Sequence, residues 1–285
     1  MTGPATGPSN GPEPTAVPAY ASVGGLGVVL DGAVLRLTLD RPDKRNALDD
    51  TMVAGMIEAL DVANRDERVR AIFLSGAGDH FCGGADIVAR NAPGGIRPRV
   101  GSIQRRVPST AHRLIGLMTT VQVPIVCAVR GYAAGIGLHL AAAADVTVAA
   151  SDATFWEPFS TRGFTPDSGG TWLLPRLVGP VRARELLLLG RRLSGDDAAA
   201  WGLIHRAVPA DDLTAAADEL TAQLAGGPTV ALGLTKWLLH ESPTSSLPAQ
   251  LQHEALALEL SSRSEDFREG LAAFGERRDP DFGGR

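Results

Sequence analysis

The chain has 285 residues, of which 44% are hydrophobic, and its formal net charge is -5. This length and composition allow a sizeable core in one large domain or two small ones. The acidic balance and the absence of a basic block argue against a nucleic-acid partner. No apolar run reaches the roughly 20 residues of a membrane span. The two cysteines lack zinc-site spacing, which predicts reduced thiols, no metal and a cytoplasmic location.

The first part of the chain predicts a tail followed by a strand and a helix. Residues 1–22 are expected to form a disordered tail, since the first twenty are rich in proline and contain no lysine or arginine. Residues 33–40 alternate apolar and polar side chains, which predicts a strand. After a loop, residues 49–66 carry apolar side chains at helical spacing.

A second unit of the same kind follows. The sequence predicts a buried strand at 69–76, a glycine-rich turn at 77–87 and a helix from about residue 104 to residue 120. The stretch between the turn and this helix, residues 89–102, is rich in Gly, Pro and Arg and lacks periodicity. We therefore expect this stretch to be mobile.

The third unit has a strand at 123–131, a glycine turn and helix at 131–145, and a further strand at 145–150. Short strands that each precede a glycine turn and a helix predict a covered α/β sheet with its turns at one edge. The glycine spacing does not match the G-x-G-x-x-G pattern of doubly wound nucleotide-binding folds. Beyond about residue 182 the amphipathic helices predict a helical layer or a subunit-contact domain.

Two glycine turns, FCGGADI at 81–87 and GYAAGIG at 131–137, each follow a buried strand and open a helix. Helix starts expose backbone N–H groups that have no partner within the helix and that carry the positive end of its dipole. Two such groups converging on one carbonyl oxygen form an oxyanion hole. The alternative interpretation is that these glycines only permit tight turns and close packing.

These turns belong to a longer pattern of motifs. After HFCGGADI and VPIVCAVRGYAAGIGLHLAAAADVTVAA come FWEPFSTRGFTPDSGGTWLLPRLVG, LLLLGRRLSGDDAAAWGLIHRAVP and EDFREGLAAFGERRDPDFGGR. In this order and spacing, the chain from Leu26 onward resembles the crotonase family, also called the enoyl-CoA hydratase/isomerase family. The resemblance implies an α/β crotonase-type spiral of ββα units over residues 23–205 and a C-terminal helical trimerisation region over residues 206–285.

The resemblance also implies partners and binding positions. The substrate would be an acyl-CoA thioester, with no cofactor beyond its coenzyme A, and the chain would form a homotrimer or a dimer of trimers. The thioester oxygen would be held by the N–H groups of Ala85 and Ile136, which suits the charge of an enolate. Coenzyme A would contact Lys44, Arg45, Ala47, Leu48, Gly83, Asp86 and Gly135. A solvated loop is the alternative interpretation of Lys44 and Arg45.

Two positions depart from the hydratases of the family. His139 and Phe159 stand where those enzymes carry the glutamates that activate water. A phenyl ring cannot exchange protons, so hydration by two carboxylates is not expected. His139 is either a neutral imidazole that moves a proton or a residue that fills the space of the glutamate. Phe159 and Trp156 are candidate walls of the acyl pocket.

Two further residues are candidates for the missing acid or base. By resemblance, Asp167 lies where some isomerases of the family carry an acid or base and where dehalogenases carry a nucleophile. In isolation, Asp167 also fits the N-cap of a helix beginning near Ser168. His112 has the spacing of the water-activating histidine of the dehalogenases, and a helix histidine bonded to backbone is its alternative interpretation.

The leading functional interpretation is double-bond isomerisation of an acyl-CoA through an enolate, with Asp167 moving the proton and with aid from His139 or His112. One alternative is hydrolytic or dehalogenase-like chemistry that uses Asp167 and His112. A hydratase with a rearranged site and a non-catalytic acyl-CoA binder are further alternatives. A serine hydrolase is disfavoured because the chain has no G-x-S-x-G elbow.

Overall fold

The computed structural model describes residues 19–86 and 99–285. Residues 1–18 of the expected tail and residues 89–98 of the expected mobile stretch lie outside these ranges. Within the described part of the chain, no helix is long and apolar enough to cross a bilayer. In the same residues, no three His, Cys, Asp or Glu side chains cluster as metal ligands would.

The last residues of the expected tail are attached to the folded chain. The Tyr20 hydroxyl donates a hydrogen bond to Oδ2 of Asp66 at 3.1 Å. The N–H of Val28 donates to Oγ of Ser22 at 3.0 Å. Ordered structure therefore begins before residue 23, because these contacts tie the segment to a helix end and to the first strand.

The strands form two sheets. Their bounds are β1 Leu26–Asp31, β2 Val34–Leu39, β3 Ala71–Gly76, β4 Ile125–Val129, β5 Tyr132–Ala134, β6 Val146–Ala150, β7 Thr154–Trp156, β8 Arg192–Ser194 and β9 Arg206–Val208. The larger sheet has the order β1-β2-β3-β4-β6-β9, and the smaller one has the order β5-β7-β8. Only the β1–β2 and β7–β8 pairs are antiparallel among the described strands.

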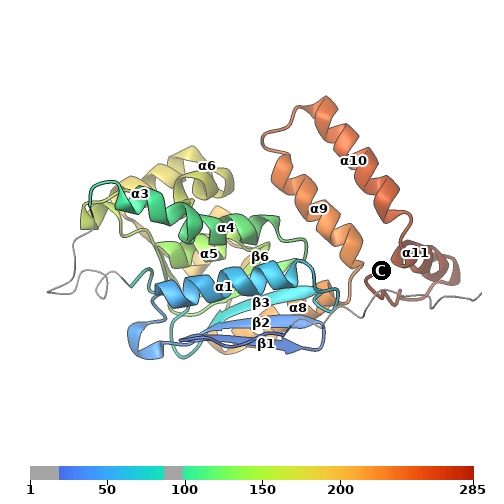
Figure 1. Cartoon of the computed structure of the whole chain (residues 1–285), viewed down its shortest axis with the longest axis horizontal. Helices are drawn as coiled ribbons and strands as arrows, with labels where there is room; N and C mark the ends of the chain where they lie inside the picture. Colours follow the sequence, from blue (N-terminus) through green and yellow to red (C-terminus); the bar gives the residue numbers. More distant parts are fainter. Residues whose placement is uncertain (1–18, 87–98) are drawn as a thin grey trace, which may run out of the picture.

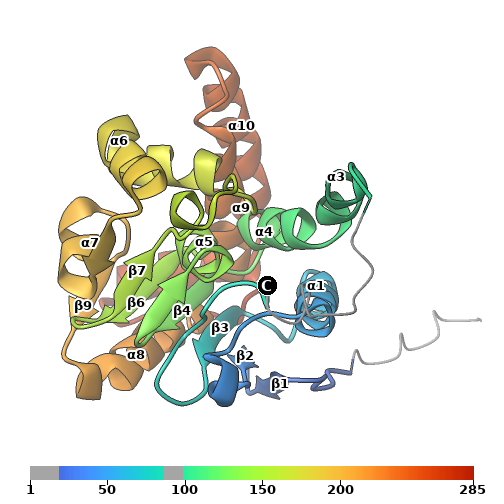
Figure 2. The same cartoon turned by 90° about the vertical axis from the view of Figure 1, so that its left-hand side faces the viewer.

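Helices cover both faces of the larger sheet. Their bounds are α1 Asp50–Ala63, α3 Ser102–Arg106, α4 Ala111–Thr120, α5 Ile136–Ala143, α6 Gly170–Leu189, α7 Gly195–Trp201, α8 Leu213–Ala225, α9 Thr229–Glu241, α10 Leu247–Ser261 and α11 Glu265–Glu276. Helix α8 packs on β3, β4 and β6 from one side, while α1 and α5 contact the sheet from the other (Figure 2). Short 3-10 turns occur at Pro42–Lys44, Val107–Ser109, Ser160–Arg162 and Ala210–Asp212.

Side-chain patterning explains the sheet. In β2, the alternate residues Leu35, Leu37 and Leu39 are buried, as expected of a strand with one covered face. In β4 every residue is buried, because helices cover both of its faces. The strands predicted at 33–40, 69–76, 123–131 and 145–150 are confirmed as β2, β3, β4 and β6.

The continuous helix predicted from residue 104 to residue 120 is wrong. The structure instead has the short helix α3, the 3-10 turn Val107–Ser109 and then α4. Pro108 accounts for the break, because its ring clashes with the preceding turn and it has no N–H to donate. The break matters for the site, since it brings Val107 and Thr110 to a cavity described below.

The sheet continues past the boundary expected at residue 205. Strand β9 pairs with β6 in parallel, and α8 then packs on the sheet. Beyond α8, helices α9 and α10 form a hairpin that extends away from the sheet (Figure 1). Lys236 fastens α9 to the core, since its Nζ lies 2.7 Å from Oδ2 of Asp145 and donates to the carbonyls of Met118 and Val123.

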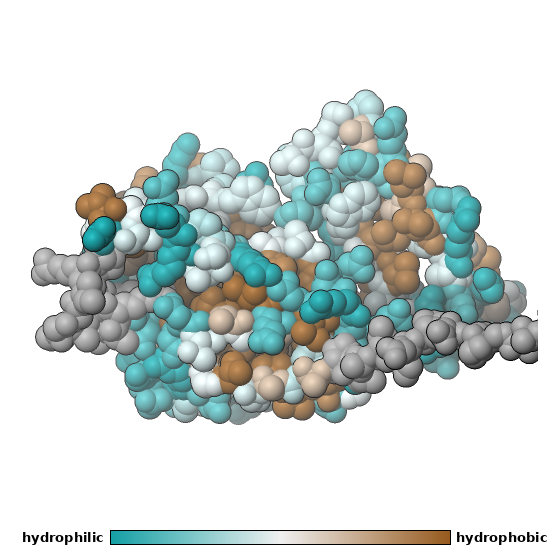
Figure 3. Space-filling model, in the orientation of Figure 1, coloured by the Kyte–Doolittle hydropathy of each residue, from teal (hydrophilic) through white to brown (hydrophobic). Residues whose placement is uncertain are grey.

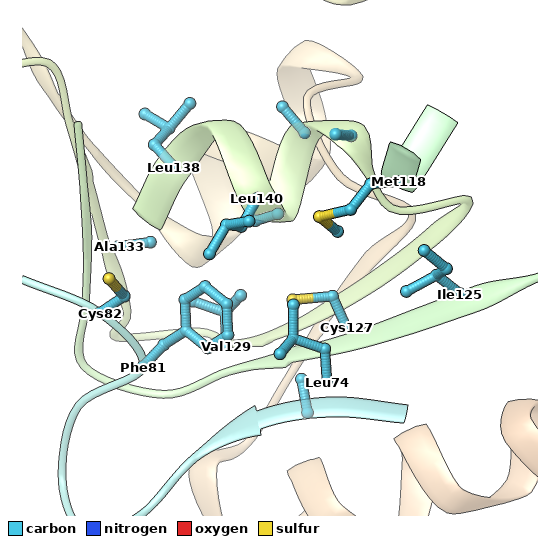
Figure 4. Close-up of a cluster of buried hydrophobic side chains, with 14 of the residues drawn as sticks. Leu74, Phe81, Cys82, Met118, Ile125, Cys127, Val129, Ala133, Leu138 and Leu140 are labelled. Atoms are coloured by element: carbon cyan, nitrogen blue, oxygen red, sulfur yellow. The ribbon is translucent and has the colours of Figure 1, made fainter. Parts of the chain in front are cut away.

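A hydrophobic cluster lies under the glycine turns. Side chains of α5, β4 and the segment after β3 meet there, among them Leu140, Val129 and Phe81 (Figure 4). Cys82 and Cys127 are free, fully buried thiols in this cluster. Burial raises the pKa of both, that of Cys82 to about 12. Both cysteines therefore serve packing rather than nucleophilic chemistry.

Candidate active site

The first glycine turn leaves one backbone N–H unused. Gly84 has a φ of +106°, and a Cβ on it would lie 3.1 Å from the Ala134 carbonyl. Leu48 pairs across this turn, since its N–H donates to the Gly84 carbonyl and its own carbonyl accepts from the N–H of Asp86, both at 2.8 Å. This pairing passes over Ala85, whose N–H has no hydrogen-bond acceptor among the described residues.

The second glycine turn presents another backbone N–H group that has no acceptor within its own helix. Gly135 has a φ of +53°, its N–H donates to the Trp156 carbonyl at 2.9 Å, and α5 begins directly after it. Ile136 is the first residue of α5, so its N–H has no acceptor within the helix. Gly137 packs closely on the first turn, because a Cβ there would lie 2.6 Å from the carbonyl oxygen of Cys82.

The two turns are fixed against each other by strand-like bonds. The N–H of Cys82 donates to the Tyr132 carbonyl at 2.8 Å, and the N–H of Ala134 donates back to the Cys82 carbonyl at 2.9 Å. Both predicted donors, Ala85 and Ile136, border one small cavity. Its described lining consists of Leu48, Val53, Ala85, Arg106, Val107, Thr110, Ala111, Ile136, Asp167 and Ser168. The structure thus brings Asp167 to the same space as the two donors.

Asp167 does not cap a helix. Helix α6 begins at Gly170, and its N-cap, Gly169, makes no side-chain cap bond. The carboxylate of Asp167 instead accepts a hydrogen bond from the Ser168 hydroxyl at 2.6 Å. Ser168 is buried and has a φ of +51°, in the left-handed region that costs a non-glycine residue free energy. The strained turn holds the Asp167 side chain at the cavity rather than at a helix end.

A buried acid that the sequence interpretation missed contacts His139. Oε1 of Glu157 lies 2.9 Å from Nε2 of His139, and both side chains are fully buried. The contact is within ion-pair distance. Burial raises the pKa of Glu157, the charge of Asp167 raises it further, and His139 lowers it. Phe159 stacks on the imidazole with its ring centroid 5.9 Å away and the planes 7° apart.

Comparison with known proteins bears on this arrangement. The model of the enoyl-CoA hydratase/isomerase family matches residues 30–285. The chain belongs to this family. It is 41% identical to a 1,2-epoxyphenylacetyl-CoA isomerase of Escherichia coli, over 90% of this chain and 97% of that one. It is also 39% identical to a probable enoyl-CoA hydratase of Rhodobacter capsulatus, over 87% and 94% of the two chains.

The fold agrees with the family. A putative enoyl-CoA hydratase from Streptomyces coelicolor superimposes with a TM-score of 0.85 at 31% identity, over 98% of this chain and all of that one. The expected crotonase fold with its C-terminal helical region is therefore confirmed. An acyl-CoA substrate follows from membership of the enoyl-CoA hydratase/isomerase family.

The loop expected to hold coenzyme A in this crotonase chain is anchored by Asn46. This residue is fully buried, and its amide donates to the carbonyls of Ala77 and His80 at 2.9 and 2.6 Å. Nζ of the exposed Lys44 lies 3.8 Å from Oδ2 of Asp86. Arg45 stands over the ring of Tyr132, 5.4 Å from its centroid. Both cations are exposed residues that border the glycine turns.

Three other predicted site residues lie outside the described cavity lining of the enzyme. His112 is exposed on α4, although its neighbours Thr110 and Ala111 border the cavity. Trp156 donates from its indole to the Gly190 carbonyl at 3.2 Å, and arginine guanidinium groups lie over its ring. Phe159 is buried against His139. The structure thus groups Asp167 with Ala85 and Ile136, and His139 with Phe159 and Glu157.

Proposed function

We propose that the chain is an acyl-CoA double-bond isomerase that works through a thioester enolate. The observation that carries this proposal is the position of Asp167, which is the single carboxylate among the described cavity-lining residues and shares that cavity with the N–H groups of Ala85 and Ile136. A base and two oxyanion donors are the groups that proton transfer next to a thioester requires.

The reaction follows from these groups. The Asp167 carboxylate takes a proton from a carbon of the acyl chain, and the electron pair moves to the thioester oxygen, where the N–H groups of Ala85 and Ile136 stabilise the charge. The enolate then collapses, and Asp167 returns the proton to a carbon two positions away. The double bond moves and no atom is gained or lost, so neither water nor a cofactor takes part in the balance.

Hydration is less well supported by the surroundings of the cavity. Phe159 has no proton to exchange, and His139 and Glu157 are fully buried against each other rather than at the cavity surface. The described lining therefore offers one carboxylate, whereas gripping and activating a water calls for two groups. A related chain named an isomerase, with 41% identity, is consistent with this choice.

The deciding experiment uses 2-enoyl-, 3-enoyl- and aryl-CoA thioesters in D₂O. The wild type is expected to shift the double bond and to incorporate deuterium at the α-carbon. Asp167→Asn should lose about two to four orders of magnitude in turnover, the usual contribution of a general base. Asp152→Asn, an exposed carboxylate in the turn between β6 and β7, is the matched control and should keep full activity.

Each contrary outcome identifies another function. Full turnover by Asp167→Asn would remove Asp167 as the base. Release of free CoA that depends on His112 would support hydrolysis instead. Tight acyl-CoA binding by the wild type with neither exchange nor turnover would leave a non-catalytic binder.

We also propose that Lys44 and Arg45 bind the nucleotide end of coenzyme A. Both are exposed cations on the loop that Asn46 anchors beside Ala85. Arg45→Ala is expected to raise KM for an acyl-CoA while leaving turnover of the matching pantetheine thioester unchanged, since the latter lacks the nucleotide. An equal effect on both thioesters would contradict this assignment.

Assembly as a homotrimer or a dimer of trimers is proposed on the exposed apolar side chains of the last helices. Leu258 on α10 and Leu271 and Phe274 on α11 are more than half exposed, and apolar side chains gather over α10 (Figure 3). Surfaces of this kind mark protein contacts. Light scattering should give the mass of three or six chains, and Leu258→Glu should lower it. A monomeric mass for the wild type would contradict the proposal.

A further inference from the structure

His139 holds both ends of the segment that carries Asp167. At the start of the segment, Oε1 of Glu157 lies 2.9 Å from Nε2 of His139. At its end, Gly170 packs on the same nitrogen, because a Cβ there would lie 2.2 Å from Nε2. Asp167 lies between these two contacts in the chain, so the geometry of the imidazole constrains where its carboxylate stands.

The pair is costly for the fold. Beyond the contact between Oε1 and Nε2, the other carboxylate oxygen of Glu157 and Nδ1 of His139 are buried with no hydrogen-bond partner among the described residues. A buried polar atom without a partner destabilises the folded state, and replacing a buried ion pair with apolar side chains is often neutral or stabilising. Packing alone therefore does not explain an acid and an imidazole at this place.

The surroundings determine how many protons the pair can hold. Phe159 covers one face of the imidazole and carries no charge. Asp167, on the same segment as Glu157, is the other charged group that acts on Glu157. With one proton the pair is neutral overall, whichever partner holds it. Without a proton, Glu157 would be a buried anion near Asp167, and with two the imidazolium would lack a counter-charge.

We infer that Glu157 and His139 share a single proton and act as a positioning pair for Asp167, holding the 157–170 segment at the cavity only in that one-proton state. The inference rests on the proposed role of Asp167 as the base. Gain or loss of the proton leaves the pair with a net buried charge and weakens the attraction between Glu157 and His139, so one of the two attachments of the segment that carries Asp167 becomes weaker. Turnover falls on both sides of the pH range in which the pair holds one proton.

Glu157→Gln tests this pair, because glutamine keeps the shape of the side chain and removes its titration. We expect kcat to fall about tenfold with KM within about twofold, as is usual when a group acts on the reacting state rather than on binding. The pH profile of kcat should change shape, because the variant has one titrating group at this place where the wild type has two. Wild-type kcat and an unchanged pH profile in Glu157→Gln would overturn the inference, because a purely structural contact needs no charge.

Asp266→Asn is the matched control. Asp266 is a buried acid on α11 whose carboxylate accepts from the N–H groups of Gly283 and Gly284. Its substitution is expected to lower the melting temperature and leave the shape of the pH profile unchanged. If Asp266→Asn altered the profile in the same way as Glu157→Gln, the effect would be general loosening and the inference would fail.

Two further results separate this inference from the proposed function. If Asp167→Asn is inactive while Glu157→Gln is fully active, the positioning pair fails and the isomerase stands. The shared proton is also visible without turnover, because the ring C–H resonances of His139, assigned with His139→Asn, should differ between wild type and Glu157→Gln at one pH. Identical resonances would overturn the shared proton even if Asp167→Asn had already removed Asp167 as the base.

Discussion

Gly170 contacts His139 so closely that no side chain fits between them, since a Cβ on Gly170 would lie 2.2 Å from Nε2 of the imidazole. Gly170→Ala is therefore expected to push the imidazole away from Glu157, to cost about 1–3 kcal/mol by overpacking, and to lower kcat at least tenfold. Urea unfolding and the isomerisation assay measure the two effects.

Gly116→Ala is the matched control for that substitution. Gly116 lies inside α4 and has no atom within 4 Å of the added methyl group. The change should stabilise the protein by about 0.5–1 kcal/mol, because alanine favours the helix, with no effect on kcat. Equal losses of activity in the two variants would mean that His139 has no special role.

Gly135 and Gly32 allow backbone strain to be separated from catalysis. Their φ values are +53° and +58°, and neither has an atom closer than 3.6 Å to an added Cβ. Gly32→Ala should lose about 1–2 kcal/mol of stability through its positive φ, and Gly135→Ala should lose more, because its ψ of -122° lies outside the left-handed helical region. Only Gly135→Ala should also lose about 10²–10³ in kcat, because relief of its backbone strain is expected to turn the neighbouring N–H of Ile136 away from the cavity, with the effect of removing one oxyanion donor. Equal turnover by the two variants would exclude Ile136 as a donor.

Glu157 predicts a pH dependence of stability. Burial, with the charge of Asp167, raises its pKa above the ordinary value of 4.5. Ionisation then destabilises the folded state, so the wild type loses stability relative to Glu157→Gln as pH rises from about 4.5 through the folded-state pKa. The difference in the free energy of unfolding is about 1.4 kcal/mol for each unit by which folding raises the pKa of Glu157. Urea unfolding at about pH 5 and about pH 8 measures it.

Glu269 should give a pH dependence of stability with the opposite sign. Hydrogen bonds from Arg278 lower its pKa to about 2. The stability it contributes is present above the ordinary pKa and is lost as pH falls toward 2. Glu269→Gln is therefore less stable than the wild type at neutral pH, and the difference shrinks in acid. The same slope for both variants would contradict the opposite surroundings assigned to Glu157 and Glu269.

Cys82 should be unreactive in the folded protein. Its thiol is fully buried, and burial raises its pKa to about 12, so the thiolate is scarce at neutral pH. Alkylation by iodoacetamide, followed by mass spectrometry, is expected to modify neither cysteine in buffer and both in urea. Rapid modification of Cys82 in buffer would show that the glycine turns open far more often than their bonds indicate.

Much of the fold could be predicted because its signals are local. The alternation of Leu35, Leu37 and Leu39 is enough to place β2, and the same kind of pattern places β3, β4 and β6. Strand β9, only three residues long, carries too little periodicity to be recognised, and it exists because β6 offers an edge to pair with. Pro108 was a readable signal for the break before α4.

The candidate site likewise has a part that could be predicted from the sequence and a part that could not. Ala85, Ile136 and Asp167 could be placed because each belongs to a motif with fixed spacing. The contact of Glu157 with His139 could not, because it joins residues from different elements that the β5–β7 pairing brings together. One signal was present in the sequence, where the acid in FWEPF stands between aromatic residues directly after strand β7. Charge in such surroundings indicates a partner that must be sought elsewhere in the chain.

Leu48 links two parts of the site mechanically. Its backbone forms both bonds that flank Ala85, and the loop that precedes it is locked by the buried amide of Asn46. A displacement of residues 44–48 would therefore also move the Gly84–Asp86 backbone. If residues 44–48 bind the nucleotide end of the substrate, as proposed above, a single span of main chain connects that binding position to the peptide N–H that we propose as an oxyanion donor.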